Sequence, residues 1–546
     1  MSGRPAGCVA RLGKTASLPS AVQHTLRAFW TSCRLRSIDQ SIPSVIAAYN
    51  RQMHAMTHDH DLYTVEQVRA LDRRAIDDLG ISGFELMSRA ATAAFACLCR
   101  QWPQARRLVV FCGPGNNGGD GYLVASLAHG AGLGVEVVEL SDAQQGDAKS
   151  ARETWQRGAG ITHRWHQDGS LPQADVYVDA LYGTGLNRAP DASASSLIDR
   201  INASGVPVMA LDVPSGLNAD TGHCPGSAIA AQLTVSFIAA KRGMYTGQSA
   251  TKVGALIVDT LGLPEILWQG MPTDAALLEA THLPPRARDA HKGDSGHVLA
   301  IGGDHGTAGA IRLCSDAALR SGAGLVSVAT RADNLFALNA ARPELMPHAV
   351  HGPQELQSLL ERATVLAVGP GLGQSAWGHA LWLTALDSNK PLVLDADGLN
   401  LLAREPRQFS APTVLTPHPG EAARLLSTTT ADIQKDRFAA VRALAQRYSA
   451  VVVLKGSGSL IAHPDGRLDV CLWGNPGMGS GGMGDLMTGV IAALIAQGCN
   501  AWMAARMGVG LHARAGDLAA LHGERGLLAS DLLEPLRTLV NGLAHA

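Results

Sequence analysis

Short apolar runs alternate with amphipathic stretches along the chain from Leu62 onward. In the first half, apolar residues at helical spacing predict helices over residues 65–79 and 83–99, followed by a buried strand over 108–112. Further β-rich runs predict strands at 135–140, 174–180, 206–211, 233–238 and 255–259. Strands separated by helical stretches imply a parallel sheet with helices on both faces.

The pattern lapses near residues 264–290, where four prolines and mixed charges indicate a linker. A second α/β series then follows, with predicted strands at 298–301, 325–329, 365–368, 392–394, 413–415 and 450–454. A chain of 546 residues exceeds what one hydrophobic core serves. We therefore expect two α/β domains, a doubly wound one at 59–270 and a second at 291–546, with a linker at 271–290.

The formal net charge of −2 provides no large positive field, which argues against nucleic acid or a membrane as the main partner. Small molecules are therefore the expected ligands. The nine cysteines contain no CxxC pair, and several lie in apolar runs, as Cys112 does. They are expected to be buried free thiols in a reducing compartment, and we expect the protein to be cytoplasmic.

Residues 1–58 differ from the rest because seven basic residues face a single acidic one, Asp39. This bias is typical of a transit peptide. Met53 and Met56 lie just before the first regular segment, so a start codon assigned too early explains the extension equally well. Both interpretations stay open.

A glycine-rich loop at residues 474–485, GNPGMGSGGMGD, runs into an uncharged segment at 486–505, for which we expect a buried core helix. The glycines allow backbone amides to turn inward, and a helix beginning near Leu486 adds the positive end of its dipole at the same point. Asp485 is then a carboxylate at an anion site, which indicates a base for a hydroxyl that attacks a phosphoryl group. The alternative is a glycine-rich turn with a helix-capping aspartate.

In the first half, the predicted strand at 108–112 ends in GPGNNGGDG, which satisfies the G-x-G-x-x-G spacing. Glu139 closes a later strand where the ribose-binding acid of a dehydrogenase lies, so a dinucleotide dehydrogenase is one interpretation. Against it, Asn116, Asn117 and Asp120 place amides and a carboxylate where a Rossmann loop has small residues. The loop is better suited to polar side-chain contacts.

Other predicted strands of this half end in Asp179 and in Asp212, the latter followed by Ser215. In a doubly wound sheet such strand ends converge on one crevice. Asn117, Asp179 and Ser215 supply hard oxygen ligands with one formal charge, a set that suits a monovalent cation. Alternatively, the aspartates cap the following turns and the asparagines shape a loop.

The motifs GPGNNGGDG, VDALYGTG, LDVPSGL and TVSFIAAKRG, the last containing Lys241, resemble the NAD(P)H-hydrate epimerase family. The motifs HKGDSGHVLAIGGD, VGPGLG, DADGLN, LTPHPGE, VLKGSGSLI and GNPGMGSGGMGD resemble the ADP- or ATP-dependent NAD(P)H-hydrate dehydratases, which have a ribokinase-like fold. The resemblance covers residues 60–540, in the order of the bifunctional repair enzymes. It implies a Rossmann-like domain followed by a ribokinase-like α/β domain.

For the first domain, the resemblance implies that two epimers of hydrated NADH or NADPH interconvert, with Asp212 as our candidate for proton handling. Potassium is implied at Asn117, Asp179 and Ser215. The residues implied to hold the hydrate are Asn116, Asn117, Gly118, Gly119, Asp120, Gly183, Thr184, Gly185, Leu186, Asn187, Arg188, Ala189 and Asp212.

For the second domain, the resemblance implies that ADP phosphorylates the ring hydroxyl and that phosphate is then eliminated. Asp485 is the implied base, Ala310, Gly371 and His418 line the hydrate site, and magnesium is held by substrate phosphates. A homo-oligomer is expected. The implied nucleotide contacts are Lys455, Gly456, Ser457, Gly458, Ser459 and Gly484. Residues 306–310 depart from the family, which often has a Met-Pro pair there. His418 and Lys455 also have ordinary interpretations as a loop histidine and a solvated lysine.

Two rival interpretations remain. The second domain could be a vitamin or sugar kinase of the same fold that retains its phosphorylated product. The first domain could be a non-catalytic binding module, because its fold also serves protein interaction. The set of Asn117, Asp179, Asp212 and Ser215 argues against the binding module.

Overall fold

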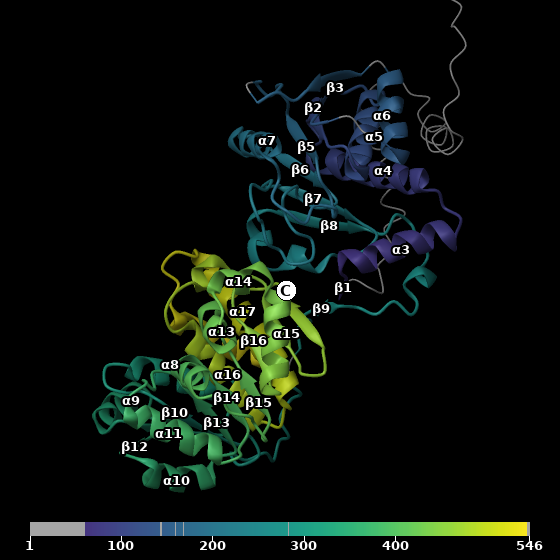
Figure 1. Ribbon diagram of the computed structural model, residues 1–546. Helices are drawn as coiled ribbons and strands as arrows, with labels where there is room; N and C mark the ends of the chain where they lie inside the picture. The colour runs from purple at the N-terminus through teal and green to yellow at the C-terminus, as the bar shows by residue number, and fades with distance from the viewer. Residues whose placement is uncertain (1–59, 142–144, 159, 168, 282, 543–546) are drawn as a thin grey trace, which may run out of the picture.

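The computed structural model describes residues 60–542 except 142–144, 159, 168 and 282, so the basic extension at 1–58 lies outside the described residues. Two α/β units stand end to end, the first in purple to teal and the second in green to yellow (Figure 1). Each unit is built on its own sheet, one of seven strands and one of eleven. The expected α/β class with two different sheets is confirmed.

The first sheet is parallel throughout, with the strand order β4-β3-β2-β5-β6-β7-β8. Its central strands have buried side chains on both faces, as expected of a sheet covered by helices on each side. The strands are β2 (Arg107–Cys112), β3 (Gly134–Glu139), β4 (Ile161–Arg164), β5 (Val176–Ala180), β6 (Val208–Leu211), β7 (Leu233–Phe237) and β8 (Ala255–Asp259).

Helices cover the two faces of this sheet through separate apolar cores. Alternate residues of β2 show the division, because Leu108 and Val110 pack with α4, α5 and α6, whereas Val109 and Phe111 pack with α7. The helices are α3 (Val65–Asp77), α4 (Gly83–Gln101), α5 (Asn116–Gly130), α6 (Gly146–Arg157), α7 (Ala192–Ala203), η1 (Arg242–Tyr245), η2 (Gly247–Thr251) and η3 (Glu265–Trp268).

The strand order of the first sheet reverses at β2. From β2 the chain moves outward to β3 and β4, and then returns to the other side of β2 with β5, β6, β7 and β8. The carboxyl ends of β2 and β5 therefore lie on either side of a topological switch point, where ligands bind in open α/β sheets. The structure thus predicts a site at this edge.

The second sheet has the order β1-β9-β18-β17-β16-β15-β14-β13-β10-β11-β12. The strands from β12 to β16 pair in parallel, whereas β17 pairs antiparallel with both β16 and β18. The strands are β1 (Asp61–Leu62), β9 (Ala275–Leu277), β10 (His297–Ile301), β11 (Leu325–Thr330), β12 (Met346–Ala349), β13 (Val365–Val368), β14 (Leu392–Leu394), β15 (Thr413–Leu415), β16 (Val451–Leu454), β17 (Ser459–Ala462) and β18 (Leu468–Cys471).

Two apolar cores lie on opposite faces of this sheet. One contains α8, α16, α17 and α18, and the other contains α10, α11, α12, α13 and α15. The helices are α8 (Ala308–Arg320), η4 (Ala332–Asn334), α9 (Leu335–Ala341), α10 (Pro353–Arg362), α11 (Ala376–Asp387), α12 (Ala396–Arg404), α13 (Pro419–Leu426), α14 (Thr430–Lys435), α15 (Arg437–Tyr448), η5 (Pro476–Met478), α16 (Met483–Ala496), α17 (Ala501–Ala519), η6 (Ala520–His522), η7 (Ala529–Leu532) and α18 (Leu533–Val540).

The single buried helix expected over 486–505 is wrong in its extent, because the segment forms the end of one helix and the start of another. Gly498 has a left-handed φ of 94°, which ends α16. The Asn500 side chain then accepts a hydrogen bond from the Met503 amide and caps α17. Among the described residues, no helix is long and apolar enough to cross a membrane.

The chain around the expected linker is partly regular. Ala275–Leu277 forms β9, which pairs with β18 on one side and with β1 on the other. The first described residues and the segment between the domains therefore both extend the second sheet (Figure 1). The division at 59–270 and 291–546 stays a prediction. The seven cysteines of the described ranges are free, and six of them are buried, as expected.

Candidate active sites at two sheet edges

A cavity of about 720 Å³ lies at the carboxyl edge of the first sheet. Its walls come from the segments that follow β2, β5, β6 and β7, together with α3 and α4. Strand order therefore brings together motifs that are far apart in the sequence. The predicted hydrate contacts that line the cavity are Asn116, Asn117, Asp120, Gly183, Thr184, Gly185, Leu186, Asn187, Arg188 and Asp212.

Three of the predicted contacts do not line this cavity. Gly118 lies against the backbone of Gly113, where an added Cβ would stand 1.9 Å from the carbonyl oxygen. Gly119 faces the Met87 side chain in the same way, and Ala189 lies beside Gly226. The two glycines thus allow α5 to approach its neighbours closely. Their role in hydrate binding stays a prediction.

A buried ion pair stands in the cavity wall between Asp212 and Lys241. The Lys241 ammonium donates to Asp212 Oδ1 at 2.6 Å, to Ser236 Oγ at 2.8 Å and to the Phe237 carbonyl at 2.9 Å. The Lys241 side chain is 1% exposed, whereas that of Asp212 is 17% exposed. Asp212 also has a left-handed φ of 62°, a strained conformation that is common at functional sites. The lysine therefore holds one carboxylate oxygen and leaves Asp212 accessible from the cavity.

Three further carboxylates line the same cavity, Asp72 from α3, Asp120 from α5 and Asp147 from α6. Burial, followed by the charges of Asp212 and Asp72, raises the pKa of Asp120 well above its ordinary value. Burial and the charge of Asp212 likewise raise the pKa of Asp72, while Lys241 opposes both shifts. Lys241 thus opposes the charges of several acids, and the raised pKa values favour the protonated forms of Asp72 and Asp120.

Sequence reasoning missed Asp72, and it named Lys241 only as part of a motif. The apolar stripe of α3 runs through Val65, Val68 and Ala75, and Asp72 lies on the same stripe between Val68 and Ala75. An acid on a buried helix face was the available signal. Lys241 follows the buried run of β7, where a lysine with no neighbouring acid in the sequence was a similar signal.

Asn117, Asp179 and Ser215, the set predicted to bind a cation, lie close around the turn after β5. Asp179 is fully buried and accepts from the Ser215 amide at 2.8 Å and the Ser215 hydroxyl at 2.6 Å. The Tyr182 amide donates to Ser215 Oγ at 2.8 Å, and a Cβ on Gly183 would stand 3.4 Å from Asn117. The three side chains are therefore near neighbours.

The chemistry of this set fits a monovalent cation. Both polar atoms of the Asn117 amide are buried, and neither has a hydrogen-bond partner in the structure. Burial raises the pKa of Asp179 to about 6, although Ser215 and Leu181 donate hydrogen bonds to it. An unpartnered amide oxygen beside a buried carboxylate is unfavourable unless a cation is bound there. The described residues contain no group of three or more His, Cys, Asp or Glu suited to a metal ion.

The second candidate site is the start of α16, where the glycine-rich loop ends. Gly482 precedes the helix with a φ of 92°, and no side chain caps the first turn. The amides of Met483, Gly484 and Asp485 therefore have no partner within the helix, which is the arrangement that the predicted anion site requires. The start of the loop is held by α17, because Asp517 of that helix accepts from the Gly474 amide at 2.9 Å and from the Asn475 side-chain amide at 3.0 Å.

Asp485 lies in the first turn of this helix and is partly buried. Burial and the neighbouring charge of Asp395 raise the pKa of Asp485 to about 7, with Lys455 opposing the shift. A carboxylate with a pKa near neutrality is matched to accept a proton at physiological pH. The predicted base thus has an environment suited to that role.

A second buried ion pair lies next to the anion site. Lys455 donates to Asp395 Oδ1 at 2.8 Å, and Thr488 of α16 donates to Asp395 Oδ2, also at 2.8 Å. Burial alone would raise the pKa of Asp395, but Lys455 and the hydrogen bonds hold it below its ordinary value. The absence of a side chain at Gly484 matters here, because an added Cβ would stand 3.1 Å from Lys455 Nζ. Lys455 is therefore a paired lysine at the anion site and not a solvated one.

His418 begins α13 and caps it, since the Gly420 amide donates to its Nδ1 at 3.0 Å. Burial, aided by the charges of Lys455 and Arg424, lowers the pKa of His418, which favours the neutral ring. Glu421 on the same helix lies 3.7 Å from Lys455 Nζ. This placement supports the ordinary interpretation of His418 as a capping residue near the lysine, and its contact with substrate stays a prediction.

Ala310 and Gly371, the remaining predicted hydrate contacts, both lie next to the backbone carbonyl of Thr307. The Ala310 amide donates to the Thr307 carbonyl at 3.2 Å, and a Cβ on Gly371 would stand 2.7 Å from the same oxygen. Leu313, one turn further along α8, lies against Gly482. The structure thus brings Ala310 and Gly371 together on the side of α8 that approaches the anion site.

Comparisons with known proteins cover both halves of the chain. A family model described as NAD(P)H-hydrate dehydratase matches residues 298–537, and one described as YjeF-related protein N-terminus matches residues 83–243. The bifunctional NAD(P)H-hydrate repair enzyme Nnr of Coxiella burnetii is 48% identical over 487 residues, which cover 88% of this chain and 99% of that protein. The Escherichia coli enzyme of the same name is 45% identical over 494 residues, covering 88% and 94%.

A solved structure of an ADP/ATP-dependent NAD(P)H-hydrate dehydratase from Bacillus subtilis, co-crystallised with ATP and Mg²⁺, is similar to the second half. It is 30% identical, with a TM-score of 0.45, and the match covers 48% of this chain and 95% of that chain.

Proposed function

This chain belongs to the family of bifunctional NAD(P)H-hydrate repair enzymes, and we propose that it restores NADH and NADPH that have been hydrated on the nicotinamide ring. The first domain interconverts the R and S epimers of the hydrate. The second domain dehydrates the S epimer with ADP and yields NAD(P)H, AMP and phosphate. The observation that carries the proposal is Asp485, whose pKa is raised to about 7 at the start of a helix with free amides.

In the dehydratase reaction, Asp485 accepts the proton of the ring hydroxyl as its oxygen attacks the terminal phosphoryl group of ADP. The P–O bond to AMP breaks and a P–O bond to the ring oxygen forms. The amides from Gly479 to Gly484, together with the dipole of α16, stabilise the negative charge on the transferring group. The C–O bond between the ring and the phosphorylated oxygen then breaks, and phosphate leaves with the electron pair. Loss of a proton from the neighbouring ring carbon restores the double bond.

The nucleotide lies on the other side of the transferred group, at the loop of residues 455–459. Lys455 is positioned by Asp395, so its charge faces the anion site at Gly484. We propose that ADP enters with Mg²⁺ held mainly by its phosphates, which neutralises charge during transfer. ADP is proposed over ATP because the fused domain order is that of the bacterial repair enzymes.

In the epimerase reaction, Asp212 handles the proton at the carbon that changes configuration. Its φ of 62° and its ion pair with Lys241 fix the carboxylate at the cavity wall. Asp72 and Asp120, which line the same cavity and have raised pKa values, act as the proton donors. Epimerisation needs a proton donor and acceptor near one carbon, and this cluster supplies both.

We propose that K⁺ binds at Asn117, Asp179 and Ser215. The support is the buried Asn117 amide without a partner and the buried Asp179 carboxylate. A bound cation would supply positive charge beside the hydrate and neutralise Asp179. Cytoplasmic location and a homo-oligomer are also proposed, the former because buried free cysteines suit a reducing compartment.

The first test measures absorbance near ~340 nm, where intact reduced nicotinamide absorbs. Purified protein, ADP, Mg²⁺ and K⁺ are added to a mixture of the two epimers of hydrated NADH. Full ADP-dependent recovery supports both activities. Recovery of one epimer alone contradicts the epimerase assignment and leaves the first domain as a binding module, and a stable phosphorylated product without recovery makes the second domain a kinase.

The dehydratase rate is expected to rise with pH and to level off above about pH 7, because Asp485 acts in its deprotonated form and its pKa is raised to about 7. Below that value, kcat/KM for the S epimer should fall about tenfold per pH unit. The measurement is the pH profile of kcat/KM with the pure S epimer. A rate that stays flat down to pH 5 contradicts Asp485 as the base.

Epimerisation is expected to require K⁺, and replacing Asn117 with alanine should weaken that requirement. The amide oxygen is one of three proposed ligands, so its loss should raise the K⁺ concentration for half-maximal epimerisation about tenfold or more. The dehydratase rate with the S epimer serves as the internal control. Equal K⁺ dependence in wild type and Asn117→Ala would contradict the site.

A further inference from the structure

The loop predicted to bind the nucleotide lies on the first domain in this structure. The Thr246 hydroxyl donates to the Gly458 carbonyl at 2.8 Å, and the Gly247 amide donates to the Ser457 carbonyl at 3.1 Å. Gly458 approaches so closely that an added Cβ would stand 2.0 Å from the Tyr245 carbonyl oxygen. The backbone of residues 457–458 therefore rests directly on the segment that joins η1 and η2.

Arg437 lies beneath the same loop and is 1% exposed. Its Nε donates to Thr246 Oγ1 at 3.0 Å, its Nη1 donates to Gln434, and its Nη2 donates to the carbonyls of Leu454 and Lys455 at 3.2 and 3.3 Å. Each of these acceptors is a neutral oxygen. Burial lowers the pKa of Arg437 to about 10. Burying a charge among neutral partners is unfavourable for stability. The guanidinium of Arg437 is a rigid, planar fork of donors, so it fixes the positions of the oxygens that accept from it.

These contacts form a relay across the domain boundary. Arg437 donates to the Thr246 hydroxyl, and that hydroxyl in turn donates to Gly458. Thr246 is fully buried, so water does not replace a lost partner there. The position of the loop carbonyls thus depends on a side chain from the other domain.

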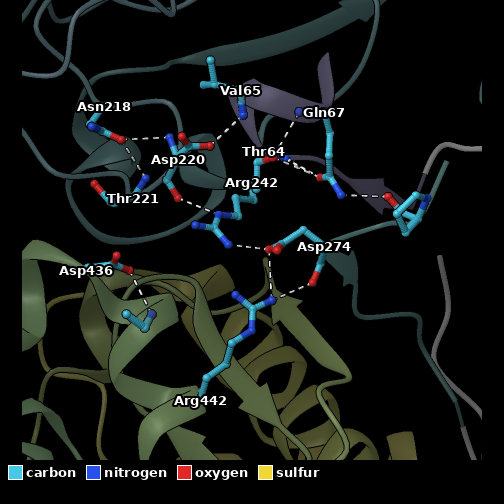
Figure 2. Close-up of polar contacts among 12 residues, drawn as sticks. Thr64, Val65, Gln67, Asn218, Asp220, Thr221, Arg242, Asp274, Asp436 and Arg442 are labelled. Carbon is cyan, nitrogen blue, oxygen red and sulfur yellow. Dashed lines mark hydrogen bonds and ion pairs between the residues drawn. The ribbon is translucent and has the colours of Figure 1, made fainter. Parts of the chain in front are cut away.

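A charged cluster holds the two domains in register beside this relay. Asp274 accepts from Arg242 of the first domain and from Arg442 of the second, the latter at 3.0 Å (Figure 2). Arg442 also donates to the Asp274 backbone carbonyl at 2.8 Å. Asp274 directly precedes β9, which is part of the second sheet. The contact between Thr246 and the loop is therefore part of a fixed interface.

The same short segment begins in the first active site. Lys241, which pairs with Asp212, is followed directly by Arg242 and η1, and Thr246 comes five positions after the lysine. Residues 241–247 thus run from the epimerase cavity to the nucleotide loop.

We propose that Thr246 and Arg437 are positioning residues for the nucleotide loop, so that the first domain is a structural part of the ADP site of the second. This inference rests on the proposed function, since it takes residues 455–459 as the ADP contact. The fusion of the two domains then has two effects: the first domain supplies the S epimer to the second, and it also supports ADP binding there.

The test measures ADP affinity by calorimetry with Mg²⁺, and KM and kcat for ADP in dehydration, using the full chain with Thr246→Val. Valine keeps the shape but leaves Arg437 Nε unpaired, and the Gly458 carbonyl loses its 2.8 Å partner and keeps only Arg437 Nη2 at 3.5 Å. The Kd and KM for ADP should rise about tenfold with little change in kcat. Thr246→Ser keeps the hydroxyl and should restore wild-type values.

Thr234→Val is the matched control. Thr234 is a fully buried threonine of the same domain that donates one hydrogen bond, to the Val253 carbonyl at 2.7 Å. Thr234 does not contact the nucleotide loop, so the Thr234→Val variant should bind ADP with the affinity of wild type. The epimerase rate, measured on all three variants, reports whether the first domain is folded.

ADP affinity within about twofold of wild type in a folded Thr246→Val variant overturns the inference. An equal loss in Thr246→Ser also overturns it, because a shape effect would then explain the result. A wild-type protein that binds ADP but restores no cofactor contradicts the proposed function and leaves the affinity comparison valid. A wild-type protein that does not bind ADP contradicts both.

Discussion

Replacing Asp485 with asparagine is expected to abolish ADP-dependent dehydration, with a fall in kcat of about 10³-fold or more. Asparagine has nearly the same shape and keeps the position at the start of α16, but it cannot accept the hydroxyl proton. The change also removes a carboxylate that Asp395 repels, so the folded state should not be destabilised. Recovery of absorbance from the pure S epimer in a single-turnover assay is the measurement.

The control for this variant is twofold. Epimerisation in the same protein should be unchanged, because Asp212 and its cavity belong to the other sheet. Asp387→Asn, at the exposed end of α11, makes the same chemical change away from the site and should keep full dehydratase activity. An Asp485→Asn variant that retains more than about a tenth of wild-type kcat would show that another group accepts the proton.

Replacing Asp212 with asparagine is expected to lower the rate of epimerisation by about 10²- to 10⁴-fold. The amide removes the proton acceptor and also leaves the buried Lys241 ammonium without its counter-charge. That second effect should loosen the cavity wall, because a buried charge without its partner is unfavourable. The measurement is the approach to equilibrium from the pure R epimer, followed by chromatography.

The dehydratase rate with pure S epimer should be unaffected in the Asp212→Asn protein, which makes it an internal control. Asp199→Asn, an exposed carboxylate on α7 of the same domain, should epimerise at the wild-type rate. If Asp212→Asn epimerises normally, the proton transfers belong to other acids that line the cavity, such as Asp72 and Asp120.

The family resemblance read from the motifs is confirmed by relatives that are 48% and 45% identical over 88% of the chain. The alternation of strands and helices was also readable, because apolar spacing within about ten residues determines which face of an element is buried. The helix predicted near Leu486 begins at Met483, directly after the left-handed Gly482. The loop and its carboxylate could be predicted because the glycines and Asp485 are contiguous in the sequence.

The elements that were missed depend on partners far along the chain. Asp61–Leu62 and Ala275–Leu277 are too short to carry a pattern, and they are strands only because β9 pairs with the free edge of β18 and β1 pairs in turn with β9. β17 and β18, which were also not predicted, form an antiparallel hairpin after the nucleotide loop, and β18 pairs on its other side with the distant β9.

The sequence by itself determined the two-domain α/β class, and it predicted the glycine-rich anion site and the roles of Asp212 and Asp485, because each is encoded within a short contiguous segment. Only the tertiary structure decided which charges meet. Lys241 reaches Asp212 across 29 residues, Lys455 reaches Asp395 across 60, and Arg437 reaches Thr246 across 191. The order of strands in each sheet brings these side chains together, and the resulting burial and charge pairing shift the pKa values of Asp395, Lys455 and Arg437, so neither effect exists in any local stretch of sequence.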